Sequence, residues 1–174
     1  DVRAVHDSLR ERVEHIRWVD LVGRESHARS HRQSARGHGR SVAFVSNRDG
    51  QYDIWVGLAA GGRLIRVTND SSVESHPSWS PDGTKIAFAK LKESGLWDIW
   101  EIPALGGPTR RVIVDATEPA WSPDGRSLAY SNLATNTIWS CDTSGGNARA
   151  VTQLDSFYRV HRQAAFSHDG KSIV

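Results

Sequence analysis

The sequence repeats itself, and this feature restricts its fold more than any other. Residues 77–88 read PSWSPDGTKIAF, and 42 residues later residues 119–130 read PAWSPDGRSLAY. The pattern opens a third time at residues 164–173, a further 45 residues along the chain. A constant period of roughly 40 residues is typical of propellers and of some solenoids, in which each repeat is one supersecondary unit. The chain is therefore predicted to consist of units that pack against their neighbours.

A second block repeats in step with the first. An Ile-Trp pair ends at Trp55, Trp100 and Trp139, and a double glycine starts six residues after each tryptophan. A valine follows twelve residues after each tryptophan. The distance between blocks varies instead, from 12 residues between Phe88 and Trp100 to 9 between Tyr130 and Trp139. Because turns fix the register of hairpins while surface loops tolerate insertions, each unit is predicted to contain two hairpins, which makes four antiparallel strands.

The Ser-Pro-Asp-Gly block predicts a tight turn between the first two strands of a unit. Proline presets φ, aspartate bonds the neighbouring backbone, and glycine accepts a positive φ. Beyond the turn, Ile86 and Phe88 alternate with other residues as in a half-buried strand. Four short antiparallel strands per unit match one β-propeller blade. The predicted fold class is all-β, with about three blades of an incomplete propeller. The residues predicted to be largely buried are Trp79, Phe88, Ile99, Trp121, Tyr130 and Ile138.

These blocks resemble the repeats of the TolB-like β-propeller family, whose units run Pro-x-Trp-Ser-Pro-Asp-Gly, Ile-Ala-Phe, Asp-Ile-Trp and Gly-Gly. The resemblance covers residues 41–174, with nearly complete units at residues 77–118 and 119–163. It implies a bacterial, periplasmic and non-enzymatic propeller, monomeric once complete, that binds a protein or peptide partner at its face. Similar blades also occur in the non-catalytic domain of prolyl-oligopeptidase-type serine peptidases and in sensor domains of bacterial regulators or kinases. The sequence leaves these two alternatives open.

The resemblance is weaker at both ends of the chain. Residues 35–39 read ARGHG, so only the last glycine fits the turn block of the first unit. In the fourth unit His168 replaces the turn proline and Phe166 replaces the tryptophan, which the turn and the core are expected to tolerate. Because the chain begins at Asp1 and stops within a repeat at Val174, it is expected to be a fragment of a longer protein.

Residues 1–40 are predicted to form a segment separate from the repeats of residues 41–174. Apolar residues recur at helical spacing from Val2 to Val19, which predicts a short amphipathic helix. Residues 26–40 hold four Arg, three His and three Ser without an acidic residue, as in a flexible basic linker. A phosphate-binding arm and a reading-frame error are the alternatives. A net charge of +2 is too small to indicate nucleic acid, so no such partner is expected.

The sequence contains no recognisable catalytic, cofactor or metal motif. It lacks a Gly-x-Ser-x-Gly elbow, and His27 and His31 have no third metal ligand near them. Cys141 replaces Ile102 of the preceding unit and is predicted to be an inert buried thiol. The longest apolar stretch, residues 54–60, is much shorter than the ~18 residues of a membrane span. The chain is therefore predicted to be non-enzymatic, with no cofactor, no metal site and no transmembrane segment.

The candidate binding residues are those that precede the innermost strand of each blade. In a propeller, the loops that enter these strands lie at the mouth of the central channel. Here the loops end in His76, Glu118 and Gln163, each three residues before the aligned Trp or Phe. The same loops also carry Glu74, Asp115, Tyr158 and Arg159. Because rigid scaffolds present binding residues on variable connections, His76, Glu118 and Gln163 are predicted to line one binding rim. The alternative is that they only solvate the channel mouth.

Overall fold

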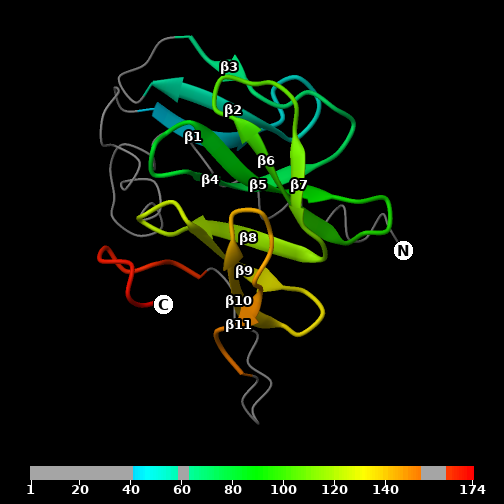
Figure 1. Cartoon of the computed structure of the whole chain (residues 1–174). Coiled ribbons are helices and arrows are strands. Elements are labelled where there is room, and N and C mark those ends of the chain that lie inside the picture. Colours follow the sequence, from blue (N-terminus) through cyan, green and yellow to red (C-terminus); the bar gives the residue numbers. More distant parts are fainter. Residues whose placement is uncertain (1–40, 59–62, 154–163) are drawn as a thin grey trace.

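The computed structural model describes residues 41–58, 63–153 and 164–174. Within these ranges the regular secondary structure consists of strands, without a helix. The strands form three antiparallel sheets that follow one another along the chain and lie one above the next in Figure 1. The predicted helix and linker of residues 1–40 lie outside the described residues. The domain boundary at residue 41 therefore stays a prediction.

Each sheet is an antiparallel meander. The first contains β1 (Ser41–Ser46), β2 (Asp53–Leu58) and β3 (Ile65–Arg66). The second contains β4 (Glu74–Trp79), β5 (Lys85–Leu91), β6 (Trp97–Pro103) and β7 (Arg110–Ile113). The third contains β8 (Ala116–Trp121), β9 (Ser127–Asn132), β10 (Thr137–Asp142) and β11 (Arg149–Ala150). Strand order within each sheet follows the chain. The predicted four-stranded blades are thus confirmed for the second and third sheets, and three strands are described in the first.

The Ser-Pro-Asp-Gly block forms the predicted turn. The Gly83 N–H donates a hydrogen bond to the Ser80 carbonyl at 2.9 Å, and Gly83 has a φ of 71°. The Asp82 carboxylate accepts a bond from the Ser80 hydroxyl at 2.6 Å, which holds the pKa of Asp82 below its ordinary value. Equivalent serine–aspartate bonds occur at Asp124 and Asp169. The local sequence therefore determines the first hairpin of each unit.

The fourth unit keeps this turn in spite of its substitutions. The Gly170 N–H donates to the Ser167 carbonyl at 2.9 Å although His168 stands in place of the proline. Phe166, in place of the tryptophan, pairs with Ile173 in an antiparallel bridge. The expected tolerance of the turn is thus confirmed, because the aspartate and glycine supply the bonds that close it.

Neighbouring sheets pack face to face, and β4 lies against both β1 and β8. The core between the first and second sheets contains Ala43, Ile54, Val56, Val67, Ile86, Phe88 and Ile102. The core between the second and third sheets contains Ala87, Ile99, Ile113, Ala116, Trp121, Leu128, Tyr130 and Cys141. Each sheet thus buries apolar residues against the sheet of the neighbouring unit. This burial stabilises stacked blades.

Of the six residues predicted to be largely buried, five are buried, and Trp79 is partly buried against the core between the first and second sheets. The five are Phe88, Ile99, Trp121, Tyr130 and Ile138. Trp121 Nε1 donates a hydrogen bond to the Ser78 carbonyl of the preceding inner strand at 3.2 Å. Trp79 is only partly buried, and its Nε1 has no acceptor among the described residues. β1 is the innermost described strand of the first sheet, and among the described residues no carbonyl there accepts a hydrogen bond from Trp79.

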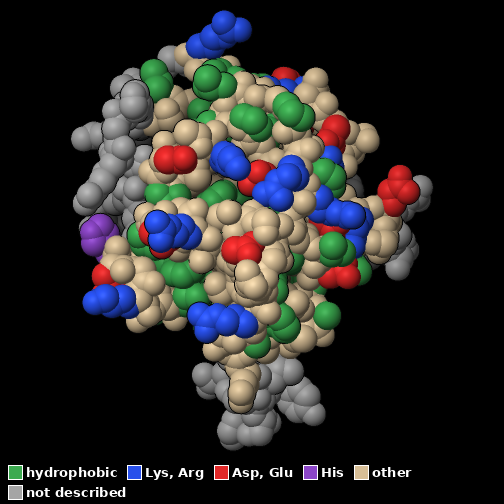
Figure 2. Space-filling view, viewed as in Figure 1, with side chains coloured by type: hydrophobic (Ala, Val, Ile, Leu, Met, Phe, Trp, Pro, Cys, Tyr) green, Lys and Arg blue, Asp and Glu red, His purple; other side chains and the backbone are tan. Residues whose placement is uncertain are grey.

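The visible surface mixes charges of both signs. Figure 2 shows Lys and Arg side chains interspersed with Asp and Glu, without a patch of one sign on the face in view. In the described part of the chain, no helix has the length and apolarity needed to cross a bilayer.

Candidate functional site

The inner strands β4 and β8 share an irregularity at the same place. Pairing of each strand with its neighbour shifts register, between Ser75 and Ser78 in β4 and between the equivalent residues of β8. The residues inside these bulges, His76 and Glu118, have φ values of 50° and 56°. Such a conformation costs a residue other than glycine about 1–3 kcal/mol. Its recurrence in two units shows that the bulge belongs to the repeat.

The strands begin earlier than the sequence suggests. His76 and Glu118 were expected at the ends of loops, but they lie within β4 and β8. Glu74 already pairs with Lys90 before the bulge, so the strand starts two residues ahead of His76. A bulge leaves its extra residue unpaired and turns its side chain away from the regular alternation. The hydrophobic pattern of the sequence therefore missed these first strand residues.

His76 and Glu118 lie next to each other across the two sheets. His76 Nε2 is 3.8 Å from Glu118 Oε1. The His76 side chain is 41% exposed, whereas the Glu118 side chain is 9% exposed. Glu118 Oε2 accepts a hydrogen bond from the Ser131 hydroxyl at 2.7 Å. The structure therefore brings two of the three predicted rim residues together, and Gln163 lies outside the described residues. Their role in binding stays a prediction.

The adjacent loop is held by a charged network that the sequence did not reveal. Lys92 Nζ lies 3.0 Å from Asp98 Oδ1 and 2.5 Å from Asp115 Oδ1. The Asp115 N–H donates to Asp98 Oδ1 at 2.9 Å, and Asp98 is buried. The hydrogen bonds that Lys92 donates to Asp115 and, with a smaller effect, to Asp98 raise the pKa of Lys92. The network fixes the connection between β7 and β8, immediately before the bulge that contains Glu118.

Glu74 is a buried carboxyl group at the junction of the first and second sheets. Its Oε2 accepts a hydrogen bond from the Thr68 hydroxyl, whose oxygen accepts the Ile54 N–H at 2.8 Å. Glu74 Oε1 has no hydrogen-bond partner in the described part of the chain. Burial raises the pKa of Glu74 to about 7, although the Thr68 hydrogen bond opposes the change. The carboxyl group therefore titrates near neutral pH.

Replacing Glu74 by glutamine is expected to increase the free energy of unfolding by about 3 kcal/mol at pH 8 but by only about 1 kcal/mol at pH 5. The folded protein binds the Glu74 proton more tightly than the unfolded chain does, in which the glutamate pKa is about 4.3. This contribution to stability is fully present below that pKa and is lost as the pH rises to about 7. Glutamine mimics the protonated form at every pH.

Denaturant titration of both proteins at the two pH values measures this effect. The exposed Glu93 provides the control, since Glu93→Gln should change stability little at either pH. An equal stability difference at pH 5 and pH 8 for Glu74→Gln would show that Glu74 is ionised in the folded protein at both.

In the described ranges, Cys141 is a buried thiol and the acidic residues form no metal-binding cluster. Cys141 is buried, and burial raises the pKa of its thiol to about 11, which agrees with the predicted inert thiol. Among residues 41–58, 63–153 and 164–174, no three His, Cys, Asp or Glu side chains gather closely enough to hold a metal ion. His27 and His31 lie outside these ranges.

Comparison with known proteins gives partial matches to propeller proteins. No protein-family model matches the chain. A tricorn protease homologue of Streptomyces coelicolor is 37% identical over 75 residues, which cover 43% of this chain and 7% of that protein. A TolB homologue of Chlorobium luteolum is 42% identical over 50 residues, which cover 29% of this chain and 12% of that protein. The matched segments thus span about an eighth or less of these relatives.

A solved structure extends the likeness to the arrangement of the sheets. The crystal structure of TolB from Acinetobacter baumannii superposes with a TM-score of 0.64, covering 76% of this chain and 34% of that one. Sequence identity over this superposition is 23%, so it concerns the fold. The sequence matches and the fold agree with the repeat pattern and with the four-stranded sheets described above. The described part of the chain therefore has the fold of about three β-propeller blades, and its repeats are similar to those of TolB.

Proposed function

We propose that these blades form a non-catalytic platform that binds a protein or peptide partner at the rim defined by His76 and Glu118. The observation that carries this proposal is the strained bulge repeated in β4 and β8, which brings the two side chains to 3.8 Å. Strained backbone persists where the surrounding structure holds it, and it is concentrated at binding sites. Gln163 is proposed as the third member of the rim because it occupies the aligned position of the fourth unit.

The chemistry of the rim suits a polar polypeptide surface. His76 offers an exposed imidazole, and the Glu118 carboxylate beside it is held in place by Ser131. The Lys92, Asp98 and Asp115 network stiffens the adjoining connection, which lowers the entropy lost on binding. The likeness to a TolB homologue supports a protein partner and a periplasmic location as parts of the same proposal. A monomeric complete propeller is a further part of the proposal.

Changing His76 to alanine together with Glu118 to glutamine is expected to weaken partner binding at least about tenfold. The glutamine keeps the side-chain volume and can still accept the Ser131 hydrogen bond, so the fold should be retained. The measurement is the affinity of the full-length protein for the partner that copurifies with it, determined by biolayer interferometry, with unfolding curves of the same samples.

Arg126→Ala is the matched control, because Arg126 is exposed in the turn at the other end of β8. It should leave the affinity unchanged. Unchanged affinity of the rim variant, with a strong loss for Arg126→Ala, would move the binding surface to the turn side and refute the proposal.

The second candidate is the propeller portion of a serine peptidase, with its catalytic groups in another domain. The match to a tricorn protease homologue favours it. On our first proposal, the full-length protein is expected not to react with a fluorophosphonate probe for activated serines. Covalent labelling of a serine outside residues 1–174, with peptide hydrolysis that stops on labelling, would favour the peptidase instead.

A further inference from the structure

The chain contains four Asp-Gly pairs, and each lies in a tight turn of the same kind. In every turn the glycine N–H donates to the carbonyl of the residue three positions before it, at 2.8 or 2.9 Å. Asp-Gly pairs are prone to isomerise, because glycine has no side chain to hinder the approach of its amide nitrogen to the aspartate carboxyl group. The four pairs begin at Asp49, Asp82, Asp124 and Asp169.

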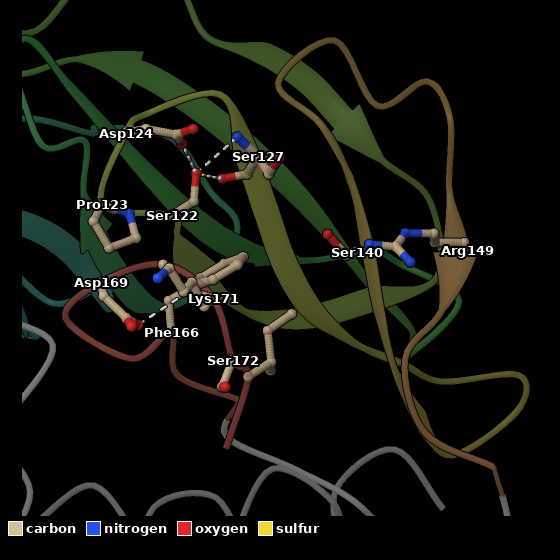
Figure 3. A pocket seen from close by; sticks show the side chains of 12 residues that line it. Ser122, Pro123, Asp124, Ser127, Ser140, Arg149, Phe166, Asp169, Lys171 and Ser172 are labelled. Carbon is tan, nitrogen blue, oxygen red and sulfur yellow. Dashed lines mark hydrogen bonds between the residues drawn. The ribbon is translucent and has the colours of Figure 1, made fainter.

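In three of these turns the aspartate carboxylate is already bonded. A serine two positions before the aspartate donates its hydroxyl to Oδ1 at 2.6 Å, and the N–H two positions after it donates to the same oxygen at 3.0 or 3.1 Å. Figure 3 shows the hydroxyl of Ser122 pointing at Asp124, joined to it by a dashed line. These bonds, the serine bond most of all, hold the pKa of Asp82, Asp124 and Asp169 below its ordinary value.

The turn at Asp49 has neither bond. Asn47 stands at the position of the serine, and in the described ranges neither Asn47 nor Gln51 donates a hydrogen bond to the Asp49 carboxylate. Arg66 NH1 lies 3.6 Å from Asp49 Oδ2, while Arg66 NH2 bonds the buried Asp53 at 2.6 Å. An ion pair between partly exposed side chains at this distance is worth little, so it does not fix the Asp49 carboxyl group in place.

The serine, and not the space around the glycine, distinguishes the two kinds of turn. No atom lies within 4 Å of the Cβ position of Gly50, and the same holds for Gly83 beside the bonded Asp82. Residues 47–51 are exposed, so water reaches the Asp49 carboxyl group. The bonds that differ all lie within residues 47–51 and 80–84, so they do not depend on which units surround each sheet.

We infer that Asp49 is a site of spontaneous isomerisation to isoaspartate, which the other three Asp-Gly pairs resist in the folded protein. The Gly50 amide nitrogen loses its proton to solvent and attacks Cγ of Asp49, so that a C–N bond forms and the carboxyl hydroxyl leaves as water. Water then attacks the main-chain carbonyl carbon of Asp49 in the resulting succinimide and breaks its bond to the Gly50 nitrogen. The chain now runs through Cγ, and the water lost in the first step is regained.

The serine bond opposes the first step of this reaction. The attacked carboxyl group must be neutral for its hydroxyl to leave, and it must turn so that Cγ faces the glycine nitrogen. In the turn of Asp82, the bonds from Ser80 and Thr84 favour the carboxylate and fix its rotation. A hydrogen bond to a charged group that must be broken before reaction corresponds to a slowing of at least about tenfold.

The modification would alter the turn that joins β1 to β2. It places Cβ in the main chain and lengthens the turn by one atom. The turn sets the register of the hairpin in which Ser46 pairs with Asp53. Arg48, next to Asp49, also packs over the Trp55 ring at 4.8 Å from its centroid. The site involves neither inner strand of the proposed rim.

The test is incubation of the folded full-length protein at physiological pH and temperature, followed by chymotryptic digestion. Cleavage after aromatic residues places three of the pairs in separate peptides with one aspartate each, residues 45–52, 80–88 and 122–130. Isoaspartyl peptides keep their mass, separate by reversed-phase chromatography and are identified by electron-transfer fragmentation, whereas deamidation of Asn47 would change the mass. Isoaspartate should form at Asp49 at least about tenfold faster than in the other turns.

Two reciprocal variants test the cause. Asn47→Ser gives Asp49 the serine of the other turns and should slow its isomerisation at least about tenfold. Ser80→Ala should speed isomerisation at Asp82 by a similar factor and leave the rate at Asp49 unchanged. In the denatured protein the rates at all four pairs should become similar, because the bonds of the turns are lost.

Three results would overturn the inference. One is an equal rate at Asp49 and Asp82 in the folded wild-type protein. Another is an unchanged rate at Asp49 in Asn47→Ser, whose circular dichroism spectrum matches that of the wild type. The third is a preference for Asp49 that persists undiminished in denaturant, since neighbouring residues and not the bonds of the turn would then set the rates.

Discussion

Replacing Gly145 by alanine is expected to lower the free energy of unfolding by about 3 kcal/mol or more. Gly145 closes the outer hairpin of the third unit with a φ of 89°. A Cβ atom there would lie 2.3 Å from the carbonyl oxygen of Val112 in the preceding sheet. The substitution thus combines a disfavoured backbone conformation with a collision against backbone that cannot rotate away. The neighbouring blades would have to separate.

Gly83→Ala separates these two effects. Gly83 has a φ of 71° in a turn of the same kind, but no atom lies within 4 Å of its Cβ position. It should cost only the conformational part, about 1–2 kcal/mol. Chemical denaturation of both variants gives the comparison. Equal losses would show that the packing between Val112 and Gly145 contributes nothing to stability.

Replacing Trp121 by alanine is expected to cost about 3–5 kcal/mol. Trp121 is buried in the core between the second and third sheets, where it packs with residues of both. Its Nε1 also donates to the Ser78 carbonyl, so the indole joins two neighbouring inner strands. Removal leaves a cavity and an unsatisfied carbonyl, and each of these is destabilising.

Trp121→Phe keeps most of the apolar volume and removes the hydrogen bond, so it should cost less than Trp121→Ala. Trp79→Phe is the matched control, because Trp79 Nε1 has no acceptor among the described residues. Unfolding monitored by circular dichroism provides the values. A loss below about 1 kcal/mol for Trp121→Ala would mean that the two sheets do not share a core.

The sequence predicts the blades well because the residues that form each hairpin lie close together in the chain. The block around Pro81, Asp82 and Gly83 contains every group that closes the turn, and the structure forms the bonds expected of it. Constant spacing from each Ile-Trp pair to its valine likewise predicts the outer hairpin. Even the substitutions at Phe166 and His168 in the fourth unit leave its turn intact.

The candidate site was less accessible from the sequence because it depends on contacts between units. The order of residues placed His76 and Glu118 at equivalent positions, but it contained no sign of the bulge or of their approach across two sheets. Burial of Glu74 depends on Thr68 from the preceding unit, which no local pattern specifies.

Hydrogen–deuterium exchange of the full-length protein, free and bound to its partner, tests the proposed binding rim most directly. Binding is predicted to slow exchange in residues 74–79 and 114–121, which contain the bulges of His76 and Glu118. Exchange in the turn at residues 80–84 should not change, because it lies at the other end of β4. Protection confined to that turn, with no change around the bulges, would contradict the rim as the binding surface.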